Sequence, residues 1–462
     1  MTMRPVLTLI AAAVALAGCS TTPMNVDCDP FRTHFTQAVP RSPTFAEIQT
    51  DVLPPRKLEG LAAGLENDKA QAFADLVTLT LPKAAMLEQQ GEGAVLALSG
   101  GGQWGAFGAG YLEELNARKA LPRFRMVTGV STGALQALFV GAAQAPGEDA
   151  AETLARLVTE YTIADEDEVV HRGGYIGAAL RGSVAKLDPL RRKIETALCS
   201  RNAVDPSTAH DCPLIAALGR RGAPVVMLGF VEGGSGEMQA VNVSAIAMAA
   251  VDKMAAKKIS MKTAQQCITA GALASVAMPF FYQQVQITSH DPGTSGPRTL
   301  TYYDGGVRQS MFLFESLKAL KTASEAASPK EAVYLIRNGP TVARIDPEID
   351  GKLGAIKTAE RGYSLIVNQS EVTAIEAIRL RDVKADIRVA TADGYDRDFT
   401  DPRAPASGQQ VCQKGDDKSM FDPAFMLCLQ AYGRAKASGQ NLQTDGWIVL
   451  TRPEIPPTPP PG

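Results

Sequence analysis

The chain has little histidine, little tryptophan and no large excess of charge: four histidines, two tryptophans and a formal net charge of −3 among 462 residues. Binding to nucleic acid through its phosphates needs a basic excess, which is missing here. No cluster of Cys and His has metal-ligand spacing, so we expect neither a metal nor another cofactor. Beyond the first 20 residues, no apolar run is long enough to predict a transmembrane helix. What remains is ordinary globular composition, with 45% apolar residues.

The N-terminus predicts export. An apolar stretch from Val6 to Ala17 has the length of a signal peptide and is too short to span a bilayer. Leu16-Ala17-Gly18-Cys19 resembles a bacterial lipobox, which implies removal of the first 18 residues and acylation of Cys19. An ordinary signal peptide with an incidental cysteine is the alternative. We expect a lipid-anchored protein of the bacterial cell envelope, and Ser20 favours the outer membrane, facing the periplasm.

An even number of cysteines remains once Cys19 is acylated, and an oxidising compartment favours disulfides between them. The pairs Cys199–Cys212 and Cys412–Cys428 would each close a short loop, so we expect these two bonds. Six cysteines allow 15 connectivities, and spacing alone does not select one. The six are Cys28, Cys199, Cys212, Cys267, Cys412 and Cys428.

Hydrophobic patterning divides the mature chain into four parts. Residues 19–90 are expected to form an N-terminal tether with a helical stretch near 66–80. From 91 to 345, apolar runs alternate with helical patterns, which is typical of an α/β sheet. Residues 346–450 are expected to form a C-terminal α/β extension, and the Pro-rich tail 451–462 an extended spacer.

Individual elements can be placed within these parts. The expected strands are Ala94–Leu98, Phe124–Thr128, Val225–Phe230, Leu300–Tyr303 and Val333–Ile336. In the extension we expect a helix near Ser364–Leu380, a strand at Ile387–Thr391 and a helix near Pro423–Lys436. The acidic run Asp165–Glu168 is interpreted as a solvated loop.

A glycine-rich turn follows the first strand. Gly100-x-Gly102-x-x-Gly105 formally matches the dinucleotide-binding fingerprint. That fingerprint also requires an acidic residue about 20 positions further on, to hold a ribose hydroxyl. No Asp or Glu occurs between Glu114 and Glu148. The sequence therefore disfavours a nicotinamide-dependent enzyme.

The second strand ends in Gly129-Val130-Ser131-Thr132-Gly133, which is G-x-S-x-G at a strand-to-helix turn. This context predicts a nucleophile elbow, in which the two glycines relieve crowding and Ser131 projects from a sharp bend. A serine that caps the helix is the simpler alternative. If Ser131 attacks an ester, the oxyanion needs donors about 3 Å away. The backbone N–H groups of Gly100, Gly101 and Gly102 are candidates, although a tight, closely packed turn would also use glycines.

A base for Ser131 is harder to find among the histidines. A hydrolase triad in the order serine, acid, histidine would have to use His290, since no histidine follows it. Tyr303-Asp304-Gly305-Gly306 instead places a carboxylate at a strand end, where Asp304 would form a Ser–Asp dyad with Ser131. A β-turn Asp-Gly is the structural alternative for Asp304. The other histidines, which lie earlier in the chain, are His34, His171 and His210.

Three ordered motifs resemble the patatin-like phospholipase family: Ser99–Gly105, Gly129–Gly133 and Asp304–Gly306. The segment Ala274–Phe281 is similar to that family's Ala-Ser-x-Ala-x-Pro segment. The resemblance implies a three-layer α/β/α fold with a mostly parallel central sheet and no metal requirement. It also implies that Ser131 is the nucleophile, Asp304 the base and Gly100–Gly102 the oxyanion loop.

Two positions depart from the family pattern. The glycine motif commonly begins with Asp and carries Arg or Lys where this chain has Ser99 and Trp104. The missing cation weakens the case for a phosphate head group more than the case for ester hydrolysis. We therefore predict a serine acyl hydrolase that cleaves lipid esters, of phospholipase or lysophospholipase type, with a lipid as its partner and no nucleic acid. The alternatives are a His290 triad esterase and a catalytically silent envelope lipoprotein.

Overall fold

The computed structural model describes residues 24–37, 94–173, 183–200, 208–254, 259–289, 297–312, 332–343, 354–380, 386–397, 399–401, 412–413, 420–439 and 446–450. The predicted helix near 66–80, the acylation site Cys19, His290 and the Pro-rich tail lie outside these residues. Among the described helices, none combines the length and the apolar character needed to cross a bilayer.

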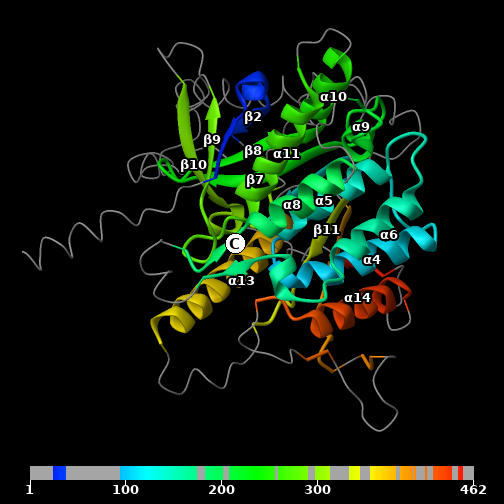
Figure 1. The fold of residues 1–462 in the computed structure, drawn as a ribbon. Helices are drawn as coiled ribbons and strands as arrows, with labels where there is room; N and C mark the ends of the chain where they lie inside the picture. Colours follow the sequence, from blue (N-terminus) through cyan, green and yellow to red (C-terminus); the bar gives the residue numbers. More distant parts are fainter. Residues whose placement is uncertain are drawn as a thin grey trace, which may run out of the picture.

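An eleven-stranded mixed sheet forms the centre of the molecule (Figure 1). Its main path runs β1 (Met24–Asp27), β9 (Val285–Ser289), β10 (Arg298–Asp304), β7 (Val225–Glu232), β4 (Phe124–Val130), β3 (Ala94–Leu98), β11 (Ala332–Arg337), β12 (Asp386–Thr391) and β13 (Ile448–Leu450). Two further strands, β8 (Met238–Asn242) and β2 (Phe35–Gln37), extend from β7. The five strands from β7 to β12 are parallel, and antiparallel partners flank them on both sides.

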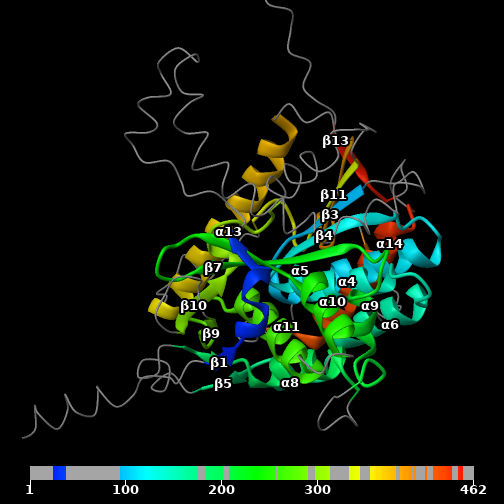
Figure 2. The same ribbon diagram turned by 90° about the horizontal axis from the view of Figure 1, so that it is seen from above.

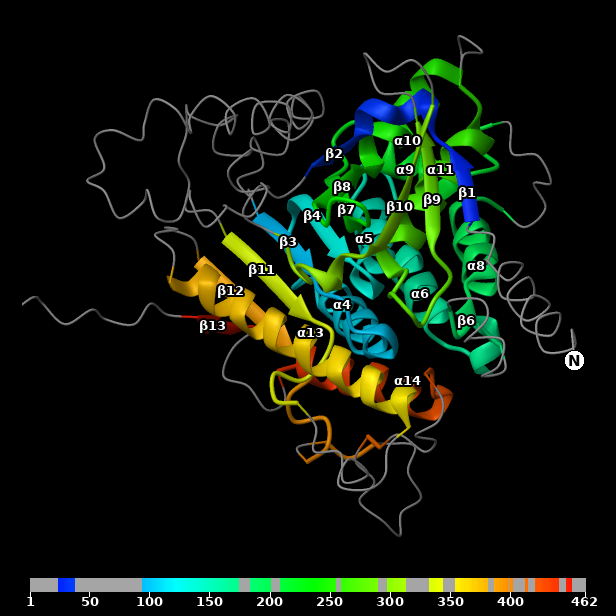
Figure 3. The same ribbon diagram turned by 90° about the vertical axis from the view of Figure 1, so that its left-hand side faces the viewer.

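Both faces of the sheet are buried, as expected for parallel strands. Alternation along β3 sends Leu96 and Leu98 into one hydrophobic cluster and Val95 and Ala97 into another. The first face is covered by α4 (Gly105–Ala117), α5 (Thr132–Ala143), α6 (Ala150–Glu160), α8 (Asp188–Leu198), α9 (Pro213–Leu218), α10 (Val243–Met254), α11 (Met261–Val276) and α14 (Pro423–Ala437). The second face packs against α13 (Ala355–Leu380), which Figure 3 shows lying across β11 and β12. The fold is therefore a three-layer α/β/α sandwich with a mostly parallel core.

All eight strands and helices expected by residue range are present. The structure adds strands that the patterning missed at both ends of the sheet, where β1, β2, β8, β9 and β13 are short or partly exposed. A separate hairpin joins β5 (His171–Arg172) to β6 (Ala185–Lys186). Short 3-10 turns complete the path: η1 (Asp29–His34), η2 (Gly102–Trp104), η3 (Glu166–Glu168) and η4 (Gly305–Val307).

Strand pairing joins segments on either side of the predicted domain boundaries. Residues 24–37, expected within a tether, place β1 beside β9 and β2 beside β8 at the edge seen in Figure 2. Across the predicted boundary at 345, β12 pairs with β11 and α14 packs along α4. Both ends of the described chain therefore belong to the same core.

Three disulfides tie loops and ends to this core. Cys199–Cys212 and Cys412–Cys428 confirm the two expected pairs, and Cys28–Cys267 adds a third across 239 positions. The third bond links the residue after β1 to α11. The acidic run Asp165–Glu168 is also more than a solvated loop, since Glu166 pairs with Arg172 and accepts backbone N–H bonds from Met420 and Phe421.

Candidate active site

Ser131 stands at a strained bend between β4 and α5. Its backbone has φ 54° and ψ −125°, a conformation that non-glycine residues rarely adopt and that is typical of a nucleophile elbow. A Cβ on Gly129 would lie 2.2 Å from the Gly133 oxygen, and one on Gly133 would lie 2.3 Å from the Leu98 oxygen. The bend therefore needs both glycines. The Ser131 side chain makes no capping hydrogen bond to α5, so the helix-cap interpretation does not hold.

The pairing of β7 explains how Ser131 and Asp304 come together. One edge of β7 pairs with β8, while the other edge pairs first with β4, up to Val130↔Gly229, and then with β10. The next β7 residue, Phe230, is the partner of Asp304. Because β10 is antiparallel to β7 and β4 is parallel to it, the carboxyl ends of β4 and β10 meet head to head. Residues 173 positions apart in the sequence thus become neighbours.

Asp304 is almost fully buried, with 5% of its surface exposed. Burial raises the pKa of this carboxyl from 3.8 to about 6, and hydrogen bonds from the Ser131 side chain and the Gly306 N–H work in the opposite direction. The Gly306 bond, 2.7 Å long, is the turn contact that an Asp-Gly sequence predicts. The carboxyl group serves the turn and faces Ser131 at the same time.

Hydrogen bonds hold the elbow from both sides. The Ser131 N–H donates to Ser275 Oγ at 2.8 Å, and the Ser275 hydroxyl donates to the Gly229 oxygen at 2.6 Å. Tyr161 and Thr132 share a hydrogen bond of 2.6 Å between their hydroxyls on the other side. Ser275 belongs to the Ala-Ser-x-Ala-x-Pro segment, and its contacts give that segment a physical role: it positions the nucleophile.

The glycine loop passes directly over Ser131. A Cβ on Gly100 would lie 3.2 Å from Ser131 Cβ, and one on Gly101, where φ is +144°, would lie 2.0 Å from the backbone oxygen of Asn338. Gly102 has φ +56° and open space around it. The loop is packed closely and reaches the nucleophile, so the two interpretations of its glycines are compatible.

The two departures from the family pattern take part in this packing. The Ser99 hydroxyl donates to the Gly100 oxygen at 2.7 Å and accepts the Asn338 N–H at 3.0 Å. Trp104 makes edge contacts with the rings of Tyr395 and Phe425, at centroid distances of 4.8 Å and 5.1 Å. Both residues therefore connect the glycine loop to the C-terminal part of the chain.

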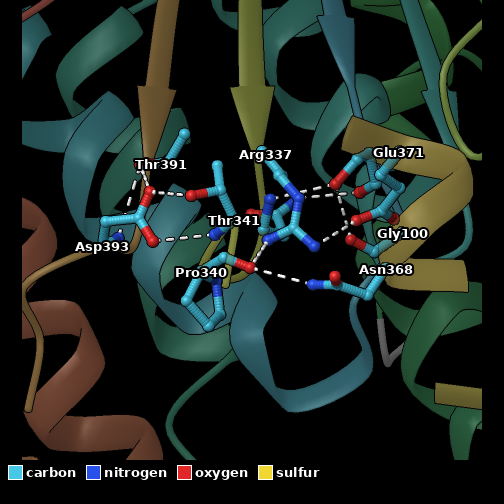
Figure 4. Close-up of polar contacts among 10 residues, drawn as sticks. Gly100, Arg337, Pro340, Thr341, Asn368, Glu371, Thr391 and Asp393 are labelled. Atoms are coloured by element: carbon cyan, nitrogen blue, oxygen red, sulfur yellow. Dashed lines mark hydrogen bonds and ion pairs between the residues drawn. The ribbon is translucent and has the colours of Figure 1, made fainter. Parts of the chain in front are cut away.

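A second charged pair was missed by the sequence analysis. Arg337, at the end of β11, pairs with Glu371 of α13 at 3.0 Å, and both side chains are buried (Figure 4). Asn368, one turn earlier on α13, and Arg337 both donate to the Pro340 oxygen. The sequence did offer one signal for this pair: Arg337 is a charged residue at the end of a buried strand. Another was Glu371 itself, which lies in the apolar stripe of α13 between Val367 and Ile375, four residues from each.

The loop after β11 is fixed at its other end by Asp393. The Thr341 N–H and hydroxyl both donate to this carboxylate at 2.7 Å, and the Thr391 hydroxyl donates at 2.8 Å (Figure 4). Since Asn338 of the same loop contacts Ser99 and lies against Gly101, Asp393 helps to hold the glycine loop in place.

Two cavities meet at Ser131. The larger, of ≈ 380 Å³, is lined by the glycine loop, Asp304 and the Arg337–Glu371 pair, with Arg361 and Tyr363 also on its wall. The smaller, of ≈ 90 Å³, is almost entirely apolar. Its lining includes Leu135, Leu138, Phe139, Leu190, Ile194 and Val276. Ser131 therefore borders both a larger chamber of mixed polarity and a smaller apolar one.

Comparison with known proteins agrees with this geometry. A family model for patatin-like phospholipases matches residues 96–317 of this chain. The family implies a lipid ester hydrolase. Among solved structures, VipD from Legionella pneumophila matches 74% of this chain and 67% of its own at 12% identity, with a TM-score of 0.30. That likeness is too low to carry an argument. No curated protein matches the sequence.

The structure places the other predicted residues as follows. His171 lies on β5, 68% exposed at its side chain, beside Asp167. His34 ends η1, and His210 lies in the turn before α9. Among the described residues, no histidine lines either cavity, and no group of His, Cys, Asp and Glu forms a candidate metal site.

Proposed function

We propose that the protein is a serine acyl hydrolase that cleaves carboxylic esters of lipids with a Ser131–Asp304 dyad. Asp304 accepts the Ser131 proton as the hydroxyl attacks the ester carbon. The backbone N–H groups of Gly100, Gly101 and Gly102 stabilise the oxyanion, and water then releases the fatty acid. The observation that supports this most strongly is the meeting of Ser131 at its strained bend with the buried carboxyl of Asp304.

The apolar cavity supports a lipid as the substrate. Its lining of leucine, isoleucine, valine and phenylalanine side chains suits an acyl chain, because transfer of each CH₂ group from water contributes about 0.8 kcal/mol. The larger cavity, with Arg337, Arg361 and Glu371 in its lining, suits the leaving alcohol and its head group. A lipid ester would place its carbonyl carbon where the two cavities meet.

The proposal also places the enzyme at a membrane through acyl chains on Cys19, in the cell envelope. Only four residues separate Cys19 from the start of β1 at Met24. A fully extended chain spans at most about 3.5 Å per residue, so this link reaches roughly 20 Å. The catalytic domain would then stay close to its lipid substrate.

Two substitutions test the dyad. Ser131→Ala and Asp304→Asn should each reduce hydrolysis of a short-chain nitrophenyl ester by at least about 10³-fold, because the first removes the nucleophile and the second the base. The wild-type rate should rise with pH through about 6, where Asp304 loses its proton. Labelling with a fluorophosphonate probe reports on the nucleophile directly.

The matched controls are Ser310→Ala for the labelling, since this hydroxyl lies in the same cavity, and circular dichroism for the fold of each variant. Full labelling of the Ser131→Ala protein, or undiminished turnover by the folded Asp304→Asn protein, would refute the dyad. Failure of the wild type to label would instead favour the catalytically silent alternative.

A further inference from the structure

The active-site cavity contains a second buried acid, Glu371, which comes from a helix beyond the family match at 96–317. Its side chain is 2% exposed. One carboxyl oxygen, Oε2, pairs with Arg337 Nη2 at 3.0 Å. The other, Oε1, is buried and has no hydrogen bond of standard geometry. A charged group with one oxygen unsatisfied inside a cavity has capacity for a further partner.

Oε1 faces the same space as the nucleophile. A Cβ placed on Gly100 would lie 3.9 Å from Glu371 Oε1 and 3.2 Å from Ser131 Cβ. Ser310 Oγ would be 3.1 Å from that point, and it too is buried with no hydrogen bond of standard geometry. An acid oxygen and a hydroxyl therefore converge on the glycine that covers Ser131.

Burial of Glu371 favours its protonated form more than an exposed position would. Burial raises its pKa to about 7, Arg337 and the nearby Ser310 hydroxyl lower it, and the charge of Asp304 raises it. Tyr363, one wall of the same cavity, has its pKa raised well above the ordinary value by burial, with Asp304, Glu371 and Tyr282 adding to the shift. Arg361 also lines this cavity. Two interacting acids of this kind titrate as a pair.

We propose that Glu371 is a second catalytic acid–base group, which alternates with Asp304 in the two halves of the acyl transfer. This inference rests on the proposed function, because it assigns a further residue to the same reaction. It is carried by the position of the buried Glu371 carboxyl, which lines the same cavity as Ser131 and lies beside Gly100.

In the first half-reaction, Asp304 is ionised and Glu371 is protonated. The Ser131 oxygen forms a bond to the ester carbon as its proton moves to Asp304. The bond from that carbon to the alcohol oxygen then breaks, and the departing oxygen takes the proton of Glu371. The products are the free alcohol, an acyl group on Ser131, a protonated Asp304 and an ionised Glu371.

The second half-reaction reverses the roles. A water oxygen bonds to the acyl carbon, and its proton moves to the Glu371 carboxylate. The bond to Ser131 then breaks, and the serine oxygen recovers its proton from Asp304. The net change is one ester and one water converted to one acid and one alcohol, with both carboxyl groups returned to their initial states.

The substitution Glu371→Gln distinguishes the role of Glu371 in the first half-reaction from its role in the second. The amide oxygen still accepts a hydrogen bond from Arg337, but the side chain can no longer exchange a proton. A nitrophenyl ester needs no acid for its departure, since nitrophenolate is a stable anion. The variant should therefore release one equivalent of nitrophenol per Ser131 in a rapid burst at nearly the wild-type rate. Its steady-state turnover should fall by about 10²-fold or more, as loss of a general base predicts.

The control is Glu113→Gln, which alters an Arg–Glu pair of similar type, Arg434–Glu113 at 2.6 Å, away from both cavities. It should leave burst and turnover unchanged. If Glu371 only braces Arg337, burst and turnover in Glu371→Gln will fall together or not at all, and the inference is overturned. A wild-type protein with neither burst nor turnover would overturn the proposed function instead.

Discussion

Asp304 is held in a place that favours its neutral form over the ionised form that the proposed chemistry uses. Burial raises its pKa from 3.8 to about 6, even though Ser131 and Gly306 offset part of that shift. Between these two pH values, the folded protein retains a proton that the unfolded chain has released. Stability contributed by Asp304 is therefore present below pH 4 and lost as the pH rises through about 6.

A stability measurement follows from this at the residue scale. Asp304→Asn should unfold at higher urea concentration than the wild type at pH 8, by about 3 kcal/mol in free energy, because it removes a buried charge while Asn still accepts the Gly306 N–H. At pH 4 the two proteins should unfold nearly together, which serves as the internal control. Equal stability at pH 8 would contradict the shifted pKa.

Residues within one local motif could be predicted from the sequence, whereas residues assembled from distant segments could not. Ser131 and Asp304 each stand in a short pattern of glycines at a strand end, so local chemistry marked them. Glu371 has no such pattern around it, and its significance depends on Arg337, which the fold brings to it from another strand. Ser310 is still less visible, because a lone serine in a loop carries no signal.

The glycine loop is held as an element by the loop that follows β11. The Asn338 backbone oxygen lies against Gly101, and its side chain donates to the Ser99 oxygen and to Gln136 Oε1 at 2.8 Å and 2.9 Å. Asp393 and Asn368 hold the other end of the same loop. The loop after β11, held at both ends, thus fixes the position of the proposed oxyanion donors.

Two neighbouring glycine substitutions test this arrangement. Gly101→Ala should lower kcat by about 10² to 10³-fold, the usual cost of losing an oxyanion donor, because its Cβ would lie 2.0 Å from the Asn338 oxygen and the loop must move. Gly102→Ala is the matched control: its φ of +56° costs about 1–2 kcal/mol of stability, but nothing lies within 4 Å of the new atom. Similar kcat values for the two variants would show that close packing against Asn338 is not essential.

Hydrophobic patterning predicted the long, regular strands and helices well, and it missed the short strands at the edges of the sheet. β3, β4, β7 and α14 have continuous burial or clear periodicity, so their sequences determine them locally. β1, β2 and β13 have only three or four residues each and exist through pairing with strands far along the chain. The pairing of β11 with β12 across the predicted boundary at 345 likewise leaves no local mark in the sequence.

At the scale of the whole molecule, only a short segment connects the proposed anchor, Cys19, to the core. Four residues separate Cys19 from β1, which pairs with β9 and is followed by the Cys28–Cys267 disulfide to α11. The same helix carries Ser275, which holds the Ser131 N–H. A pull on the N-terminus is therefore resisted by a sheet edge and a covalent bond before it reaches the site.

The anchor predicts a difference between two kinds of substrate. Cys19→Ser should hydrolyse a soluble nitrophenyl ester at the wild-type rate, because the site is untouched. Its hydrolysis of phospholipid in vesicles should fall at least about tenfold, because the enzyme is no longer tethered to them. The comparison uses wild-type protein purified from membranes with its acyl chains intact. Equal rates on vesicles would contradict the anchor and leave the dyad untouched.

The last described helix also has a consequence for when the enzyme becomes active. Met420, Phe421 and Phe425, at and just before the start of α14, line the cavity that contains Ser131, and Glu371 is contributed only a short distance earlier in the chain. A ribosome completes Ser131 roughly three hundred residues before it completes that wall. The cavity around the proposed nucleophile is therefore complete only when the C-terminal part of the chain has been made.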